Sequence, residues 1–214
     1  MISEIKLHDV LPNVFSDLEI KSQVWKQNVV FQKGKKYMIE AASGTGKTSL
    51  CRFIYGCRFD YSGSILFDDI DIKNYSIDEW SKNRTQHLAF LQQDMRLFGE
   101  LSVMDNIMIK NKLTDYKTRR EVVDMLQQVE LDHKVNTLSM QLSLGQQQRV
   151  AIIRALCQPF SFLILDEPVS HLDEYTNNLV SSLVKSEITQ REAGLIVTSV
   201  GNIMNVDFDN ILAL

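Results

Sequence analysis

The sequence predicts an α/β fold with a mainly parallel sheet, and three observations support this. Short apolar runs alternate with stretches of helical periodicity. The run Phe162–Leu165 is apolar throughout and ends in Asp166, as expected of a parallel strand covered on both faces. With 44% hydrophobic and 23% charged residues, the 214-residue chain has the composition of a globular protein and can bury a substantial core.

The N-terminal forty residues are expected to form strands. Three segments combine apolar or β-branched residues with polar flanks, and a turn is expected at Lys33-Gly34. These segments are Ile5–His8, Val29–Phe31 and Lys36–Glu40.

A helix is expected next, from Thr48 to Tyr55, because Gly56 is typical of the position after a helix end. The Ser62-Gly63 pair is expected to precede a short strand, Ile65–Phe67.

From about Asp94 to Leu156 the chain is expected to be helical. Val122, Leu126 and Val129 recur at helical spacing. Ser143 is expected to cap a helix that continues to the end of this region.

The C-terminal part is expected to contain one more amphipathic helix, marked by Tyr175, Leu179 and Leu183. The apolar segments Leu195–Thr198 and Asn210–Leu212 are expected to be strands. Together with the earlier segments, they give the alternation of strands and helices that predicts the parallel sheet.

Bulk properties exclude several classes of protein. The net charge of −4 argues against a dedicated nucleic-acid binder, so no nucleic acid is expected as a partner. Three cysteines without a C-x-x-C pair indicate reduced thiols in a cytosolic protein. Neither a signal peptide nor an apolar run near the roughly 20 residues that span a bilayer is found, so any work at a membrane is expected to pass through a partner.

Residues 41–48 match the phosphate-loop pattern G-x-x-x-x-G-K-[ST] except at Ala41. The backbone N–H groups of Gly44–Thr48 can surround phosphate oxygens at the start of a helix. Lys47 supplies an ammonium group, and the Thr48 hydroxyl can bind Mg²⁺. If position 41 requires a positive φ, alanine there costs about 1 kcal/mol. The alternative is an ordinary turn with an incidental lysine.

Asp166 and Glu167 follow the buried strand, at the sheet edge where open α/β sheets bind ligands. One carboxylate can complete a Mg²⁺ shell, and the other can orient a water for attack on a γ-phosphate. Glu167 is the candidate general base. The alternative is a solvated acidic turn after a core strand.

Downstream of the phosphate loop, Leu142-Ser143-Leu144-Gly145-Gln146 opens a helix rich in glutamine and arginine. In this order the motifs resemble the nucleotide-binding ATPase subunit of an ATP-binding-cassette (ABC) transporter. The pattern from Arg96 to Ile107 resembles the lipoprotein-release, macrolide-export and cell-division branch. The resemblance implies a P-loop NTPase with a RecA-like parallel-sheet core, an N-terminal antiparallel β subdomain and a helical insertion. It implies a single domain over 1–214, with its core at 1–93 and 155–214 and a helical subdomain at about 94–154.

The resemblance also implies the roles of individual residues. ATP and Mg²⁺ would be bound between two subunits, with Ser143 and Gly145 contacting the γ-phosphate held by the opposite subunit, and the loop Ser170–Asp173 facing the dimer. The implied catalytic residues are Glu167, Gln93 and Ser199. The implied Mg²⁺ ligands are Thr48, Gln93 and Asp166. The implied nucleotide contacts are Phe15 (with Trp25 as the alternative aromatic), Ser43, Gly44, Thr45, Gly46, Lys47, Thr48, Ser49, Ser143, Gly145, Gln146 and Asp173.

Two departures from the family pattern bear on activity. Leu144 replaces a signature glycine, and Ser199 stands where the family usually has a histidine that links the γ-phosphate to the catalytic glutamate. Loss of such a transition-state contact commonly costs 10²–10³-fold in rate, about 3–4 kcal/mol, so ATP binding with slow hydrolysis is expected. His171 is expected at an interface or in solvent rather than in catalysis. The apolar segment from Met95 to Ile107 is either core or part of a groove for a permease helix.

The resulting hypothesis is a cytoplasmic ATPase subunit that dimerises with ATP and lies at the inner face of the cell membrane through an integral-membrane permease. The alternative is a nucleotide-gated regulatory clamp with little turnover. A soluble family member in DNA repair or translation is disfavoured, because the chain has no long coiled-coil insertion or second cassette.

Overall fold

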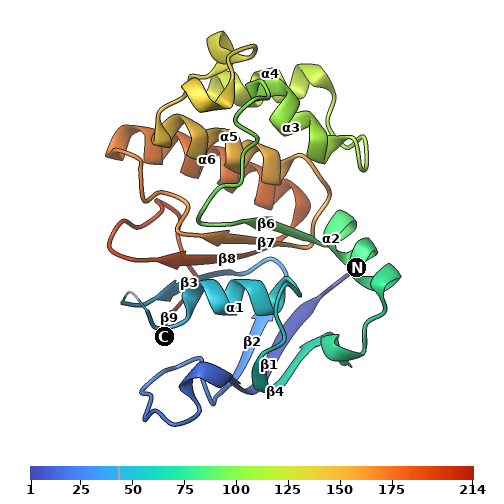
Figure 1. Ribbon diagram of the computed structural model, residues 1–214, viewed down its shortest axis with the longest axis vertical. Helices are drawn as coiled ribbons and strands as arrows, with labels where there is room; N and C mark the ends of the chain where they lie inside the picture. Colours follow the sequence, from blue (N-terminus) through green and yellow to red (C-terminus); the bar gives the residue numbers. More distant parts are fainter. Residues whose placement is uncertain (43) are drawn as a thin grey trace.

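The computed structural model describes residues 1–42 and 44–214 and confirms the predicted α/β architecture (Figure 1). A parallel sheet has the strand order β6-β7-β8-β3-β9, and a separate antiparallel sheet has the order β2-β1-β4-β5. The strands are β1 (Glu4–Pro12), β2 (Asn28–Gln32), β3 (Lys36–Glu40), β4 (Tyr61–Phe67), β5 (Ile70–Asp71), β6 (Leu88–Leu91), β7 (Phe162–Asp166), β8 (Gly194–Ser199) and β9 (Asn210–Ala213). The α-helices are α1 (Lys47–Ile54), α2 (Ile77–Gln86), α3 (Val103–Asn111), α4 (Arg119–Gln128), α5 (Leu144–Leu156) and α6 (Glu174–Arg191).

The parallel sheet is covered on both faces. Figure 1 shows α1 between this sheet and the antiparallel sheet, with α5 and α6 on the opposite side. Phe162 and Ile164 of β7 belong to the core shared with α1, whereas Leu163 and Leu165 belong to the core shared with α3, α4, α5 and α6. Because both faces are covered, every residue of β7 is buried, as its apolar sequence predicted.

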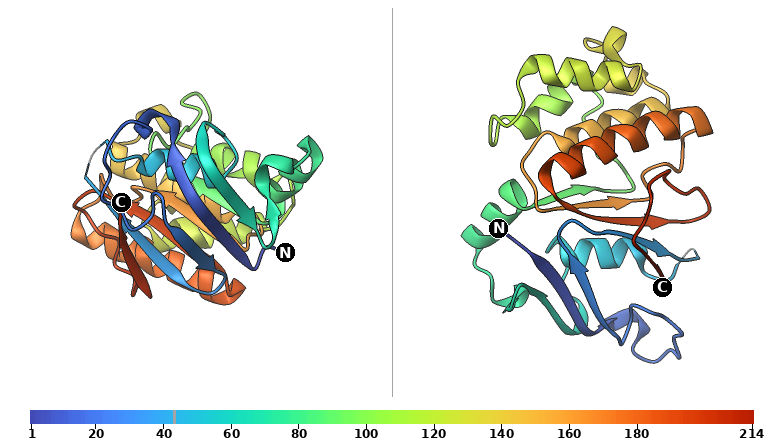
Figure 2. Two further views of the ribbon diagram at one scale, coloured as in Figure 1. Left: turned by 90° about the horizontal axis from the view of Figure 1, so that it is seen from below. Right: turned by 180° about the vertical axis from the view of Figure 1, so that it is seen from behind.

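The helical region predicted after Asp94 contains α3, α4 and α5. The view from behind shows α3 and α4 at the end of the molecule away from the antiparallel sheet (Figure 2). Helix α5 contacts α3 and α4 as well as β6, so it joins this end to the parallel sheet. Ser143 caps α5, as predicted. No helix within residues 1–42 and 44–214 is long and apolar enough to cross a membrane.

The strand predicted at Ile65–Phe67 was too short, because β4 begins at Tyr61. Gly63 therefore lies within the strand rather than before it. Its φ is +78°, and a Cβ there would lie 2.4 Å from the His8 carbonyl oxygen. The pairing of β1 with β4 shifts register at this point, so the glycine permits a close approach of two strands.

Helix α6 forms where predicted, but the predicted apolar stripe was partly wrong. Tyr175 is 59% exposed, and its hydroxyl donates to Glu130 Oε1 at 2.7 Å. The buried stripe instead begins at Val180 and continues through Val184 and Ile188, together with the predicted Leu183. The helix thus turns a different set of i, i+4 positions towards the sheet.

Three elements, β5, α2 and β6, were not predicted. Ser76 and Glu79 form a reciprocal capping box at the start of α2, and this S-x-x-E pattern was the available sequence signal. Helix α2 buries Trp80 against Phe67 and Tyr75, and it precedes the edge strand β6 directly.

Candidate active site

The phosphate-loop segment connects β3 to α1 at the carboxyl edge of the parallel sheet. Gly44 and Gly46 have φ values of +85° and +99°, which favour glycine, and Gly46 caps α1. Ala41 is not among the described residues with a positive φ, so the cost considered for alanine does not arise. Ser43 lies outside the described residues.

Lys47, Gln93 and Glu167 converge on this loop. Lys47 Nζ donates to the Ala42 carbonyl oxygen at 2.8 Å and lies 3.8 Å from Glu167 Oε1. Gln93 Nε2 donates to Glu167 Oε2 at 3.2 Å. Glu167 has a φ of +51°, a conformation uncommon for residues other than glycine. The structure therefore brings together residues from α1, from the segment after β6 and from the end of β7.

Oxygen donors suited to a hard divalent cation lie in the same region. The Thr48 hydroxyl is 3.5 Å from Gln93 Oε1. Asp166 is buried, its Oδ1 accepts from the Thr198 hydroxyl at 2.6 Å, and its Oδ2 has no hydrogen-bond partner among the described residues. The described residues contain no group of three or more His, Cys, Asp or Glu that could hold a metal. A hydroxyl, an amide oxygen and one carboxylate nevertheless fit the preference of Mg²⁺ for few protein oxygen ligands.

Both candidate aromatic residues lie against the phosphate loop. A Cβ on Gly46 would come within 3.0 Å of Phe15 Cε2 and of Trp25 Cζ2. Trp25 is buried, and its indole N–H donates to the Thr45 carbonyl oxygen at 3.0 Å. Phe15 is half-buried and lines a cleft of about 310 Å³ with Gly44, Lys47, Thr48, Ser49, Gln93 and Glu167. Of the two rings, Phe15 is the one that faces the cleft.

The segment Leu142–Gln146, called the signature segment below, lines part of a second, separate hollow. Ser143 accepts a hydrogen bond from the Gln146 N–H, and the Gln146 side chain accepts one from the Ser143 N–H. Asp173 caps α6, and the bond that it accepts from the Thr176 amide holds its pKa below the usual value. The hollow is lined by Ser143, Leu144, Gly145, Arg149, His171, Leu172, Asp173 and Thr176, none of which lines the phosphate-loop cleft.

Ser199, a candidate catalytic residue, does not line the cleft. It is 3% exposed at the end of β8, and its hydroxyl donates to the Asn202 carbonyl oxygen at 2.6 Å. The hydroxyl is thus engaged in the turn that follows the strand.

Two buried polar residues, Gln148 and Thr198, support the acidic pair, and the sequence analysis did not predict this role. Gln148 is buried, and its side chain donates to the Glu167 carbonyl oxygen at 3.0 Å and accepts from the His171 N–H at 3.0 Å. The Thr198 hydroxyl bonds Asp166 and accepts from the Glu167 N–H at 3.2 Å. For Thr198 the available signal was a hydroxyl at the end of an apolar run, whereas Gln148 lies in a polar run that gives no such signal.

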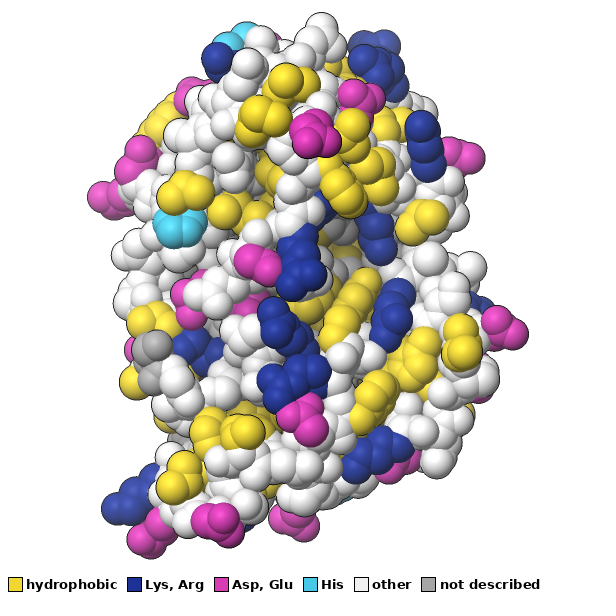
Figure 3. Space-filling model, in the orientation of Figure 1, with side chains coloured by type: hydrophobic (Ala, Val, Ile, Leu, Met, Phe, Trp, Pro, Cys, Tyr) yellow, Lys and Arg dark blue, Asp and Glu magenta, His cyan; other side chains and the backbone are white. Residues whose placement is uncertain are grey.

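Three cations without a carboxylate partner lie between α2, α3 and α5. Arg84 donates to the Tyr55 carbonyl oxygen at 3.2 Å, Lys110 Nζ donates to the Arg84 carbonyl oxygen at 3.3 Å, and Arg154 donates to the Arg96 carbonyl oxygen at 2.8 Å. None of the three forms a salt bridge within the described part of the chain. Burial, with the nearby Arg154 and Arg84, lowers the pKa of Lys110. On the face of the molecule that Figure 3 shows, Lys and Arg side chains gather along the middle, beside hydrophobic side chains.

The apolar segment Met95–Ile107 contributes both to the core and to the surface. Val103, Met104 and Ile107 are fully buried, whereas Phe98 is 55% exposed. The core interpretation is therefore confirmed for these three residues, and the groove for a permease helix stays a prediction, with Phe98 as an exposed apolar residue of the segment.

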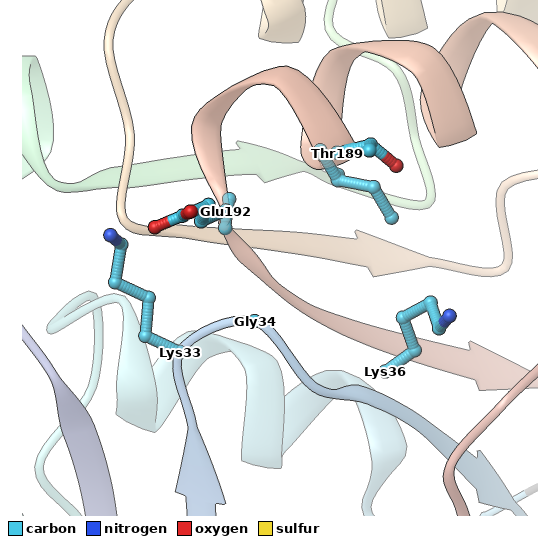
Figure 4. Close-up of a pocket in the computed structure, with 7 residues that line it drawn as sticks. Lys33, Gly34, Lys36, Thr189 and Glu192 are labelled. Atoms are coloured by element: carbon cyan, nitrogen blue, oxygen red, sulfur yellow. The ribbon is translucent and has the colours of Figure 1, made fainter.

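Another hollow lies at the opposite edge of the parallel sheet, where β3 begins and α6 ends. Figure 4 shows Lys33 and Lys36 on either side of Gly34, with Thr189 and Glu192 from the end of α6. It is distant in the fold from the carboxyl ends of the strands, where the phosphate loop and Glu167 lie. None of the residues expected to bind nucleotide line it.

Comparison with known proteins gives the family. The family model described as "ABC transporter" matches residues 26–170. The lipoprotein-releasing system ATP-binding protein LolD of Buchnera aphidicola is 35% identical over 162 residues, which cover 74% of this chain and 71% of the relative. The ABC transporter ATP-binding protein YtrE of Bacillus subtilis is 32% identical over 166 residues, covering 76% and 71%.

Solved structures agree with this result. The dimeric structure of MJ0796, described as a bacterial ABC transporter cassette, has a TM-score of 0.78 at 27% identity and covers 91% of this chain and 87% of that chain. A post-hydrolysis state of the same cassette bound to ADP and Pi has a TM-score of 0.77 at 25% identity, with the same coverage. The chain therefore belongs to the ABC transporter family and is an ABC-type ATPase with a P-loop, RecA-like fold.

Proposed function

We propose that two copies of this chain bind two ATP molecules between them and thereby power an integral-membrane permease. The observation that carries this proposal is that one chain holds two separate parts of a nucleotide site. In the described part of one chain, the phosphate-loop cleft and the signature hollow share no lining residue. A head-to-tail dimer would place each cleft against the signature of the other copy, and the helical subdomain at about 94–154 would carry that signature.

The geometry of the cleft supports the roles that we propose for its residues. The backbone of residues 44–49 would surround the phosphates, with Lys47 against their charge and Phe15 against the adenine. Ser43 is included in this set on sequence alone. Thr48, Gln93 and Asp166 would hold Mg²⁺, which when bound would neutralise charge on the phosphate oxygens.

Glu167 is the residue proposed to orient the attacking water. Lys47 and Gln93 hold its two carboxylate oxygens, at 3.8 and 3.2 Å, at the cleft. A carboxylate fixed in this way can accept a proton from water as the water attacks the γ-phosphate. We propose slow turnover, because the Ser199 hydroxyl is engaged with Asn202 and Leu144 presents a large side chain, 56% exposed, at the signature.

The surface between α2, α3 and α5 is the one proposed to receive the permease. Its three cations, Arg84, Lys110 and Arg154, would pair with carboxylates on a partner segment, and Phe98 would contact its apolar side chains. Bound in this way, the chain would lie on the cytoplasmic face of the membrane, held there by its partner. The similarity to LolD supports a permease of the lipoprotein-release type.

ATP turnover by the purified chain beside its Glu167→Gln variant tests the proposal, with dimer formation followed by light scattering. We expect the variant to lose turnover and to accumulate ATP-dependent dimers. A variant that remains monomeric at saturating ATP contradicts the sandwich. A nucleotide-gated clamp, which Ser199 and Leu144 favour, predicts ATP-dependent dimers without turnover in either protein, even when the permease is present.

A further inference from the structure

The loop between β7 and α6 carries a histidine on the same surface as the signature serine. His171 is exposed and lines the hollow that contains Ser143 and Gly145. Its main chain is fixed: the His171 N–H donates to Gln148 Oε1 at 3.0 Å, and a Cβ on Gly145 would lie 2.8 Å from the His171 carbonyl oxygen. The imidazole is therefore held next to the start of α5 by its own backbone.

Among the described residues that line it, the phosphate-loop cleft has no second cationic donor from its own chain. Lys47 is the one cation among its described lining residues, and it also bonds loop carbonyls and lies near Glu167. Ser199, at the position where a histidine is usual, gives its hydroxyl to Asn202. Phosphoryl transfer develops charge on the γ-phosphate oxygens, and donors directed at them supply much of the catalysis.

We propose that His171 supplies this donor across the dimer, with its imidazole N–H bonded to a γ-phosphate oxygen of the ATP held by the other copy. This inference rests on the proposed ATP-sandwich dimer. Among the other residues of the hollow, Arg149 directs its guanidinium to the carbonyl oxygens of Val129 and Gly145, and Asp173 caps α6. The His171 imidazole makes no hydrogen bond to another described residue, so it is free to meet a partner.

The first test compares ATP turnover of the full chain with that of His171→Ala. We expect the variant to lose about 100-fold in kcat, the usual effect of removing one transition-state donor, while ATP affinity of the monomer stays the same. His133→Ala is the matched control, because His133 is an exposed histidine that does not line the hollow, and it should retain full turnover. In the His171→Ala background, Ser199→His should restore turnover by at least about tenfold by supplying a donor in cis. Full turnover in His171→Ala overturns the inference.

The second test asks whether His171 acts across the dimer. Mixing inactive Glu167→Gln with His171→Ala creates heterodimers in which one site has both Glu167 and His171, contributed by different copies. We expect the mixture to recover about a quarter of wild-type turnover, since about half of the dimers carry one complete site of two. If the mixture does not recover turnover although Glu167→Gln forms ATP-dependent dimers, the role of His171 is overturned and the proposed dimer is not. Failure of Glu167→Gln to dimerise overturns the proposed sandwich itself.

Discussion

The side-chain amide of Gln148 donates a 3.0 Å hydrogen bond to the main-chain carbonyl of Glu167. The same side chain accepts from the His171 N–H and donates to the Ser170 hydroxyl at 3.2 Å. Gln148 lies on α5, directly after the signature segment. One buried side chain thus joins the signature helix to the acidic residue of the cleft and to the loop that precedes α6.

Gln148→Ala is expected to lower both stability and turnover. It leaves the His171 N–H without its partner, which costs about 1–3 kcal/mol in the free energy of unfolding. It also removes one donor from the Glu167 carbonyl, which keeps the hydroxyl of Ser170 at 3.2 Å. Because Glu167 has a positive φ, loss of this bond should also release its carboxylate from the cleft and lower kcat. Urea unfolding and ATP turnover, with exposed Gln128→Ala as the control, check both effects. Unchanged turnover in a destabilised variant would show that Gln148 is structural only.

Much of the site was predictable from the sequence because its conformation is local. The phosphate loop adopts positive φ at Gly44 and Gly46, which glycine permits. Ser143 and Gln146, three residues apart, form a capping box. The strand before Asp166 was predictable because an apolar run of that length is buried in almost any α/β fold.

The remainder depends on contacts between distant residues. Gln148 bonds residues 19 and 23 positions away, so its role follows only from the packing of α5 on the loop after β7. The Ser199 hydroxyl is directed by a turn at Asn202 that no motif predicts. Helix α2 escaped prediction because its first residue, Ile77, is 88% exposed while Trp80 is buried, which leaves no clear apolar stripe.

Phe15→Ala is expected to weaken ATP binding through the base rather than the phosphates. Stacking of a base on an aromatic ring is worth about 1–3 kcal/mol, so affinity should fall roughly tenfold or more. Binding of inorganic tripolyphosphate should be unchanged, because Lys47 and the loop backbone remain. Phe15→Tyr should bind ATP as the wild type does. Equal losses for ATP and tripolyphosphate in a calorimetric titration would assign Phe15 to support of the loop at Gly46 instead.

Lys110→Met is expected to stabilise the isolated chain. Burial and two neighbouring arginines lower the pKa of Lys110 from 10.5 in the folded chain. At pH values between this lowered pKa and 10.5, the unfolded chain therefore binds more protons than the folded chain. The wild type should therefore gain stability as the pH rises through that window, and the advantage of the variant should shrink. Urea unfolding across this range checks it, with exposed Lys112→Met as the control. A difference that does not depend on pH would contradict the assigned charge penalty.

Gly145→Ala is expected to weaken the ATP-dependent dimer while leaving ATP binding to the monomer intact. Two effects oppose each other: alanine favours a helix by about 1 kcal/mol over glycine, whereas overpacking costs about 1–3 kcal/mol. The clash should dominate, because the added Cβ would meet the His171 carbonyl at 2.8 Å and main chain cannot move aside as a flexible side chain can. Gly99→Ala is the matched control, since its Cβ would lie an ordinary 3.4 Å from Met140. Light scattering of both variants in the Glu167→Gln background measures the effect, and equal dimerisation by the two would show that the loop at His171 adapts to the added methyl group.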